Sequence, residues 1–267
     1  MDAATAEVAV DLEAEQAALD AVIGHLPEAA WGRATPAAGW VVQDQVAHLA
    51  LGEELAAVAA TDAAAFFERL AAAAADLAGY EEAMLSRGRS LSPAQVLDWW
   101  RSARRDTLAA VAAADPEARI PWVGPPMKPR TFLTARLMET FAHGQDVRDS
   151  LGLPPQETGR LRHVAHLGVA TRAFSYTNRG LLPPEAPVRV ELRGPAGEAW
   201  SWGPDDAPER VSGPLIDFCL VVTQRRNVAD TRLTVQGAAA AEWMRIAQAF
   251  GGPPTDGRPP SRHVEEP

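Results

Sequence analysis

The 267-residue sequence contains little of what several classes of protein require. Its one cysteine, Cys219, excludes a disulfide bond within the chain and suits a reducing cytoplasm. The apolar residues around Cys219 favour a buried structural thiol, because reactive cysteines lie in polar and partly exposed places. No apolar run reaches the roughly 18 residues of a membrane helix, and the acidic N-terminal stretch does not resemble a signal peptide. We therefore expect a cytoplasmic protein without a membrane partner.

Lysine is also scarce, and acidic residues outnumber basic ones by 35 to 25. Lys128 is the only lysine, and the formal net charge is -10. A nucleic-acid-binding protein needs clustered Lys and Arg to contact phosphates, so this composition argues against a nucleic-acid partner. The oligomeric state cannot be read from the sequence. Apolar residues make up 47% of the chain, which is enough to bury a sizeable core.

The spacing of apolar residues changes along the chain. It is helical through most of the first 180 residues and then alternates in the way that is typical of strands. Helices are expected over residues 6–25, 41–59, 62–86, 92–114, 131–151 and 156–178, and later over 213–226 and 238–250. Strands are expected over residues 187–194, 198–203 and 231–237.

These elements predict an α+β protein with two domains. The first, residues 1–180, is an all-helical bundle, and the second, residues 181–250, is a small α+β domain. Residues 251–267 are rich in Pro and Gly and are expected to be a disordered tail.

Chemistry is concentrated in one predicted helix, where Glu139 and His143 are four residues apart and so share a face. Two ligands at this spacing can hold a metal ion, with a third supplied by another helix. His48 lies among apolar residues in the middle of the second predicted helix. Two imidazole nitrogens and one carboxylate are the ligand set of a catalytic zinc. A pair of ordinary core histidines remains the alternative.

Two buried carboxylates could orient these histidines. Asp44 precedes His48 by four residues, and Asp146 follows His143 by three. Each could accept a hydrogen bond from the ring nitrogen that does not face the metal.

Three stretches resemble a known family. "GWVVQDQVAHLALGEE" and "METFAHGQDVRDSLG" resemble two helices of DinB-like bundles, and more closely the N-terminal domain of mycothiol-dependent maleylpyruvate isomerases. "PLIDFCLVVTQRRN", followed by "LTVQG", is similar to the small C-terminal domain of that family. The closest resemblance is to a subgroup described only as metal-binding.

The resemblance implies a four-helix bundle with added helices, followed by a sterol-carrier-like domain. It implies a divalent metal, usually zinc, on His48, Glu139 and His143, and mycothiol as a cosubstrate whose thiolate adds to an activated alkene. A family arginine that meets the substrate carboxylate corresponds to Arg225, with Arg226 as the neighbouring alternative. A salt bridge of Arg225 to Asp217 or Asp230 is the structural alternative. The Ala- and Arg-rich composition is typical of a high-GC genome, in which mycothiol is plausible.

The sequence departs from the family in two ways that leave the substrate open. The family has Gly and Trp where this chain has Gln224 and Val221. The stretch "PWVGPPMKPRTF" is not part of the family signature, and its Trp122, Met127 and Phe132 could form a wall of the substrate pocket or could equally be loop anchors.

The sequence therefore predicts a mycothiol-dependent isomerase or transferase that acts on a small electrophilic substrate. A thiol-independent metal enzyme (a hydrolase, lyase or cyclase), a non-catalytic metal-binding module and a helical domain without metal are the alternatives.

Overall fold

The computed structural model describes residues 1–261, apart from the side chains of residues 77, 78, 80 and 81. The chain divides into two compact units, Met1–Pro154 and Pro155–Pro267. The division lies earlier than the boundary expected near residue 180. Helices α8 (Arg162–Ala170) and α9 (Arg172–Thr177) pack on α10 (Leu215–Val222) and α11 (Ala238–Ile246) of the second unit. No helix in the described part of the chain has both the length and the apolarity to cross a membrane.

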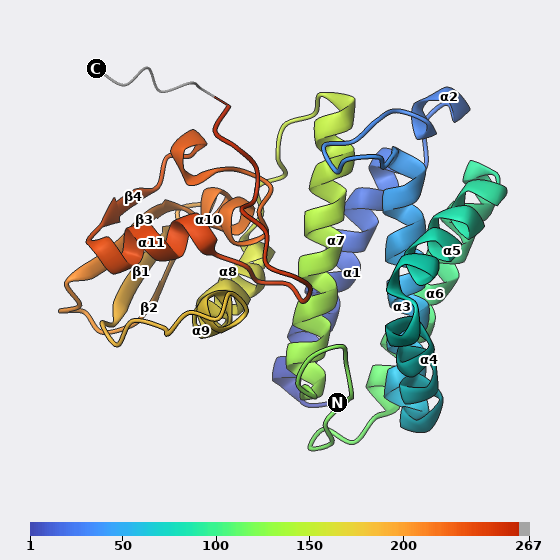
Figure 1. Ribbon diagram of the computed structural model, residues 1–267, viewed down its shortest axis with the longest axis horizontal. Helices are drawn as coiled ribbons and strands as arrows, with labels where there is room; N and C mark the ends of the chain where they lie inside the picture. The colour runs from blue at the N-terminus through green and yellow to red at the C-terminus, as the bar shows by residue number, and fades with distance from the viewer. Residues whose placement is uncertain (262–267) are drawn as a thin grey trace. The chain divides into compact units, whose positions relative to one another are not determined.

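The first unit is helical (Figure 1). Its elements are α1 (Ala3–Ile23), α2 (Glu28–Trp31), α3 (Val42–Thr61), α4 (Ala63–Ala75), α5 (Leu77–Ser90), α6 (Pro93–Ala113) and α7 (Pro129–Leu151). Helix α3 packs against α5, α6 and α7, and α1 packs against α7. The long helices were predicted from the sequence, whereas the short helix α2 lies in a stretch that was expected to be a loop.

One predicted helix, over residues 62–86, is two helices in the structure. Asp76 separates α4 from α5, and its extended backbone stops the first helix. The Asp76 carboxylate accepts a hydrogen bond from the Gly79 backbone and so caps the second helix. Ser92 and Pro93 begin α6 as predicted, since the Ser92 hydroxyl accepts from the Gln95 backbone.

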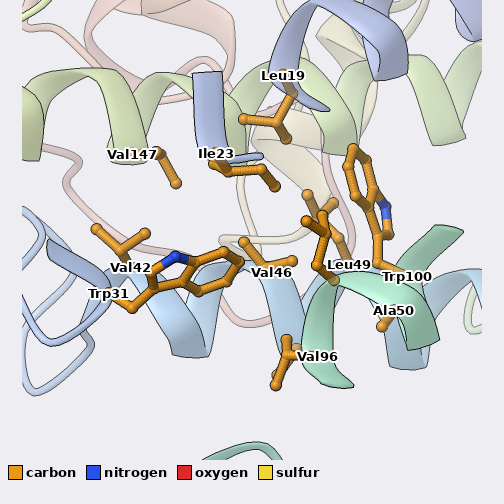
Figure 2. Close-up of a cluster of buried hydrophobic side chains, with 12 residues drawn as sticks. Leu19, Ile23, Trp31, Val42, Val46, Leu49, Ala50, Val96, Trp100 and Val147 are labelled. Atoms are coloured by element: carbon orange, nitrogen blue, oxygen red, sulfur yellow. The ribbon is translucent and has the colours of Figure 1, made fainter. Parts of the chain in front are cut away.

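The core of the first unit lies where four helices meet (Figure 2). Its labelled side chains include Leu19 and Ile23 from α1, Val42, Val46, Leu49 and Ala50 from α3, Val96 and Trp100 from α6, and Val147 from α7. The apolar residues of α3 thus face α1, α6 and α7, which fixes the rotation of α3 about its own axis. That rotation determines where the polar residues of α3 point.

The second unit combines a sheet with short helices (Figure 1). Its elements are η1 (Gly159–Leu161), α8 (Arg162–Ala170), α9 (Arg172–Thr177), β1 (Val188–Arg193), β2 (Ala199–Trp202), β3 (Glu209–Pro214), α10 (Leu215–Val222), η2 (Val228–Asp230), β4 (Thr234–Gln236) and α11 (Ala238–Ile246). The helix expected over 156–178 is interrupted at Thr171.

The sheet has the order β2-β1-β3-β4 and is mixed. Strands β1 and β3 are parallel, and each has an antiparallel partner at the edge. Residues Val188, Val190 and Leu192 are buried and alternate with charged residues, so one face of β1 is covered. Helix α10 packs on β1 and β3, and α11 packs on β3.

The strand β3 was missed in the sequence, and the described tail is ordered chain rather than disordered. Arg258 O accepts a hydrogen bond from Asn227, and the Ser261 backbone donates to Asp230. These contacts tie residues 251–261 to the second unit, whereas residues 262–267 lie outside the described part of the chain.

Candidate metal centre

The structure brings the three predicted ligands together inside the first unit. His48 lies in the middle of α3, and Glu139 and His143 lie one turn apart on the facing helix α7. The Nε2 of His143 is 3.3 Å from Oε2 of Glu139, and the Nε2 of His48 is 3.9 Å from the same oxygen. One ligand atom from each residue lies within 4.8 Å of the other two. Two helices therefore hold two imidazoles and a carboxylate around one point.

A chain of hydrogen bonds defines the tautomer of His143. The Trp40 carbonyl can only accept, so the Thr35 hydroxyl donates to it at 3.0 Å. Thr35 then accepts from Nε2 of Gln45 at 2.9 Å, which turns Oε1 of the same amide toward His143. That oxygen lies 2.6 Å from Nδ1 of His143, and Nδ1 must therefore carry a proton. The other ring nitrogen, Nε2, faces Glu139 and is the one that a metal ion could bind.

This arrangement fits a cation. A proton on Nε2 of His143 can bridge to the Glu139 carboxylate oxygen 3.3 Å away, and a bound metal ion would take the place of that proton. Burial raises the pKa of Glu139, but hydrogen bonds from His143 and His48 and the charge of Arg136 outweigh it, so this pKa lies well below its usual value. The carboxylate is thus ionised, and the donor set is the one that divalent zinc prefers.

Trp40 covers one side of the cluster. Its ring is stacked on His143 at 6.1 Å and tilted against His48 at 5.4 Å, between ring centroids. The two imidazoles are themselves 4.3 Å apart. The His48 side chain keeps 37% exposure and that of His143 14%, so the cluster remains accessible on another side.

The two predicted outer carboxylates have different surroundings. Asp44 is fully buried, and its oxygens accept from Arg89 at 3.0 and 2.8 Å and from the Val41 backbone at 2.9 Å. The structure thus places Asp44 at the start of α3 rather than on a histidine. Asp146 is buried on α7 one turn after His143, as its spacing predicted. Gln45, which the sequence analysis missed, contacts Nδ1 of His143, and the role of Asp146 at the centre stays a prediction.

Two of the three possible pocket residues, Trp122 and Phe132, are part of an aromatic cluster. The Trp122 ring is stacked on Phe66 at 5.8 Å and meets the edge of Phe132 at 5.2 Å. Phe132 is fully buried and belongs to the core. Met127 exchanges two backbone hydrogen bonds with Ile120, which close the Pro-rich loop. These contacts place Trp122 and Phe132 against each other and make Met127 a loop anchor.

A cavity of about 840 Å³ lies along the part of α3 that follows His48. Leu51 and Leu55 line it, and they follow His48 by three and seven residues, which puts them on the same side of the helix. Its remaining walls come from α4, α5 and the loop residue Val123. This volume suits a small organic molecule.

Arg225 and Arg226 lie in the second unit, just after α10. The Arg225 side chain donates to the Thr223 carbonyl at 2.7 Å. The alternative partner Asp217 is instead bound by Arg232, at 3.0 Å. Gln224, where the family has Gly, has a φ of 58° in the left-handed region, which explains why Gly suits this position. The substrate-binding role of Arg225 and Arg226 stays a prediction.

The fold and the cluster define a helical bundle with a candidate metal centre, joined to a small α+β unit. The family model for the mycothiol maleylpyruvate isomerase N-terminal domain matches residues 12–148, which include all three candidate ligands. The chain therefore belongs to this family. A second model, described as wyosine base formation, matches residues 184–236 in the other unit.

Similar proteins cover nearly the whole chain. Two proteins from strains of Mycobacterium tuberculosis, each named only as uncharacterized, are 46% identical over 93% of this chain and 96% of their own. Two crystal structures of the mycothiol-dependent maleylpyruvate isomerase, one of them a mutant, match with a TM-score of 0.58. They cover 83% and 86% of this chain and 89% and 92% of theirs. At 14% identity, this likeness concerns the fold alone.

Proposed function

We propose that the protein is a cytoplasmic, divalent-metal-dependent enzyme that uses mycothiol as an isomerase or thiol transferase. Its substrate is a small electrophile that is unsaturated and carries a carboxylate or carbonyl group. The observation that carries the proposal is the convergence of His48, Glu139 and His143 in a chain of the mycothiol maleylpyruvate isomerase N-terminal domain family.

Zinc is the ion we propose for the centre. When bound, a zinc ion supplies Lewis acidity that lowers the pKa of a thiol, so that thiolate forms at neutral pH. Three protein ligands leave positions open for such a thiol, which is the pattern of catalytic rather than structural zinc sites.

The residues around the centre have separable tasks. Glu139 supplies the negative charge that offsets the cation, and His48 and His143 supply neutral nitrogens. Gln45 holds His143 in the tautomer whose Nε2 can bind a metal. Trp40 covers the imidazoles on one side and limits the access of water there. The cavity beside Leu51 and Leu55 is large enough for the small electrophile.

The second unit enters the proposal only through the resemblance to the isomerase family. There, a sterol-carrier-like domain contributes the arginine that corresponds to Arg225. An Arg225→Ala variant should then retain its metal and lose activity toward an acidic substrate. Loss of the metal or of the fold in this variant would remove the assigned role.

Metal analysis of the purified, untagged protein tests the centre. We expect about one divalent ion per chain in the wild type and in His25→Ala, whose exposed histidine lies outside the cluster. We expect almost none in His48→Ala or His143→Ala, and weakened binding in Glu139→Gln. Metal in the wild type that persists in both His→Ala variants would contradict the centre.

A coupled assay then tests the chemistry. The metal-loaded protein is incubated with maleylpyruvate or a related unsaturated acid, with and without mycothiol. Turnover that depends on both metal and mycothiol supports the proposal. Metal-dependent turnover without mycothiol would favour a hydrolase, lyase or cyclase, and bound metal without turnover of any tested acid would favour a non-catalytic metal-binding module.

A further inference from the structure

A buried arginine one turn from the metal centre forms no ion pair with a described residue, although its charge acts on Glu139 and Glu53. Arg136 precedes Glu139 by three residues on α7 and is 5% exposed. No carboxylate within residues 1–261 lies at ion-pair distance from its guanidinium, and none of the described residues accepts a hydrogen bond from it. Its buried Nε in particular has no partner. An arginine cannot lose its charge in a protein, so burial without a partner is costly.

The guanidinium is nevertheless held in a defined place. Its central carbon lies 4.6 Å from the centroid of the Trp122 ring, in a cation–π contact. On α3, a side chain at Gly52 would place its Cβ 3.0 Å from Nη1 of Arg136, so the glycine makes room for the charged group. An aromatic face and a helix backbone therefore fix the guanidinium, and its buried Nε has no hydrogen-bond partner.

A second buried polar atom without a hydrogen-bond partner lies close by on α3. Glu53 follows Gly52 on α3, is fully buried, and has an Oε2 without a partner. Burial raises the pKa of Glu53 to about 7, and the charge of Arg136 opposes this increase without cancelling it. Glu53 is thus a poor counter-ion for Arg136 near neutral pH. Buried polar atoms without hydrogen-bond partners, such as Arg136 Nε and Glu53 Oε2, are uncommon in native proteins and need an explanation.

The cavity described above reaches the same part of the unit. Leu51 and Val123 line it, and they are the chain neighbours of Gly52 and Trp122, between which the guanidinium is held. The cavity thus ends at the chain neighbours of the residues that hold Arg136, and Arg136 itself is not among its lining residues.

We infer that Arg136, in addition to the predicted Arg225, binds a carboxylate of the substrate, and that its planar fork makes a small organic acid the ligand class of this site. The inference deepens the proposed function and rests on it for the identity of the reaction. Guanidinium and carboxylate groups match in geometry and can form two parallel hydrogen bonds. Such a bond pair would satisfy the unused donors of Arg136 and would hold the acid one helical turn from Glu139.

Calorimetric titration of the metal-loaded protein tests the inference with maleate, fumarate and acetate as carboxylate probes and maleamide as a neutral control. We expect the wild type to bind at least one acid and not the amide. Arg136→Met, which keeps length and removes charge, should lower the affinity about 10–100-fold, as for a lost charged hydrogen-bond pair. Arg136→Lys should lower it less, because the charge remains.

Glu53→Gln is the matched variant that keeps the inference falsifiable if Arg136→Met does not fold. In titrations above pH 7, where Glu53 is ionised, removal of this competing carboxylate should tighten binding of the acid several-fold. Absence of carboxylate binding by the wild type, equal affinity in folded Arg136→Met, or weaker binding by Glu53→Gln would each overturn the inference.

Failure of the proposed function gives a different pattern. Metal content and mycothiol dependence are measured on the same samples. A wild type without metal or thiol-dependent turnover, in which Arg136→Met still abolishes maleate binding, would end the proposed function and leave the carboxylate site. A metal-loaded, mycothiol-dependent enzyme in which Arg136→Met leaves maleate binding unchanged would support the proposed function and end the carboxylate site.

Discussion

Oε1 of Gln45 lies 2.6 Å from Nδ1 of His143 and determines which nitrogen of that ring can bind a metal. The amide is itself held by Thr35, so its orientation does not depend on the histidine. Gln45 is not a candidate ligand itself, but it orients the candidate ligand His143 on another helix. Metal-bound histidines commonly have such an acceptor on the opposite nitrogen, and its loss weakens metal binding.

Gln45→Leu should lower the metal affinity of the protein about 10–100-fold while the fold is kept, because the His143 ring then loses its fixed tautomer and orientation. Competition with a chromophoric chelator measures this affinity. Gln43→Leu is the control, since Gln43 lies on the same helix but donates to the Gly88 and Leu91 carbonyls. Equal affinities in the two variants would show that Gln45 has no part in the site.

Asp44→Asn should affect stability rather than metal binding. The Asp44 carboxylate binds Arg89 through two hydrogen bonds and caps the Val41 backbone. Loss of the charge at this buried position should cost about 1–2 kcal/mol of unfolding free energy. Denaturant unfolding and metal analysis of the same variant test this. A stable variant that has lost its metal would restore Asp44 to the role that its spacing with His48 first indicated.

The ligands could be predicted from the sequence because each one leaves a local signal. Glu139 and His143 are four residues apart on a helix, and His48 is a histidine in an apolar helix. Gln45 leaves a weaker signal, three residues before His48 on the same helix. Its partner lies on α7, far away in the sequence, so its role appears only when the two helices pack. Asp44 is spaced equally well from His48, but its carboxylate binds Arg89, which lies far away in the sequence.

The secondary structure likewise includes elements that local residues predict and elements that only long-range contacts explain. Ser92 and Pro93 mark the start of α6 in the sequence, and the structure follows them. Strand β3 has the sequence Glu-Arg-Val-Ser-Gly-Pro, which is neither apolar nor clearly alternating. It becomes a strand because it pairs with β1 on one side and β4 on the other. Pairing of this kind is not visible in the strand's own residues.

Gln224 offers a test of local strain. Its φ of 58° lies in the left-handed region, where a Cβ is unfavourable. Gln224→Gly and Gln224→Ala both lose the side-chain hydrogen bond to the Ala247 carbonyl, so their difference isolates the backbone. The Gly variant should be more stable than the Ala variant by about 1 kcal/mol. The opposite order in thermal unfolding, which is usual at ordinary positions, would contradict the left-handed conformation.

The raised pKa of Glu53 should make the protein less stable as the pH rises toward 7. Burial raises its pKa to about 7, against the effects of Arg136, Thr107 and Arg104 and together with that of Glu139. A carboxyl group with a raised pKa binds its proton more tightly in the folded state than in the unfolded state. This group's contribution to the free energy of unfolding is therefore fully favourable below the unfolded pKa near 4.5 and is lost as the pH rises through about 7.

The free energy of unfolding should fall by about 3 kcal/mol over this pH range, since the pKa of Glu53 is about 7 in the folded state and near 4.5 in the unfolded state. Glu53→Gln has no proton to lose, so its stability should be flatter than that of the wild type between pH 4.5 and pH 7. Above pH 7 the variant should be the more stable of the two, since the neutral amide keeps the shape without the buried charge. Urea unfolding of both proteins across this pH range measures the difference. Parallel curves for the two proteins would mean that Glu53 is ionised at its ordinary pKa and that burial does not govern it.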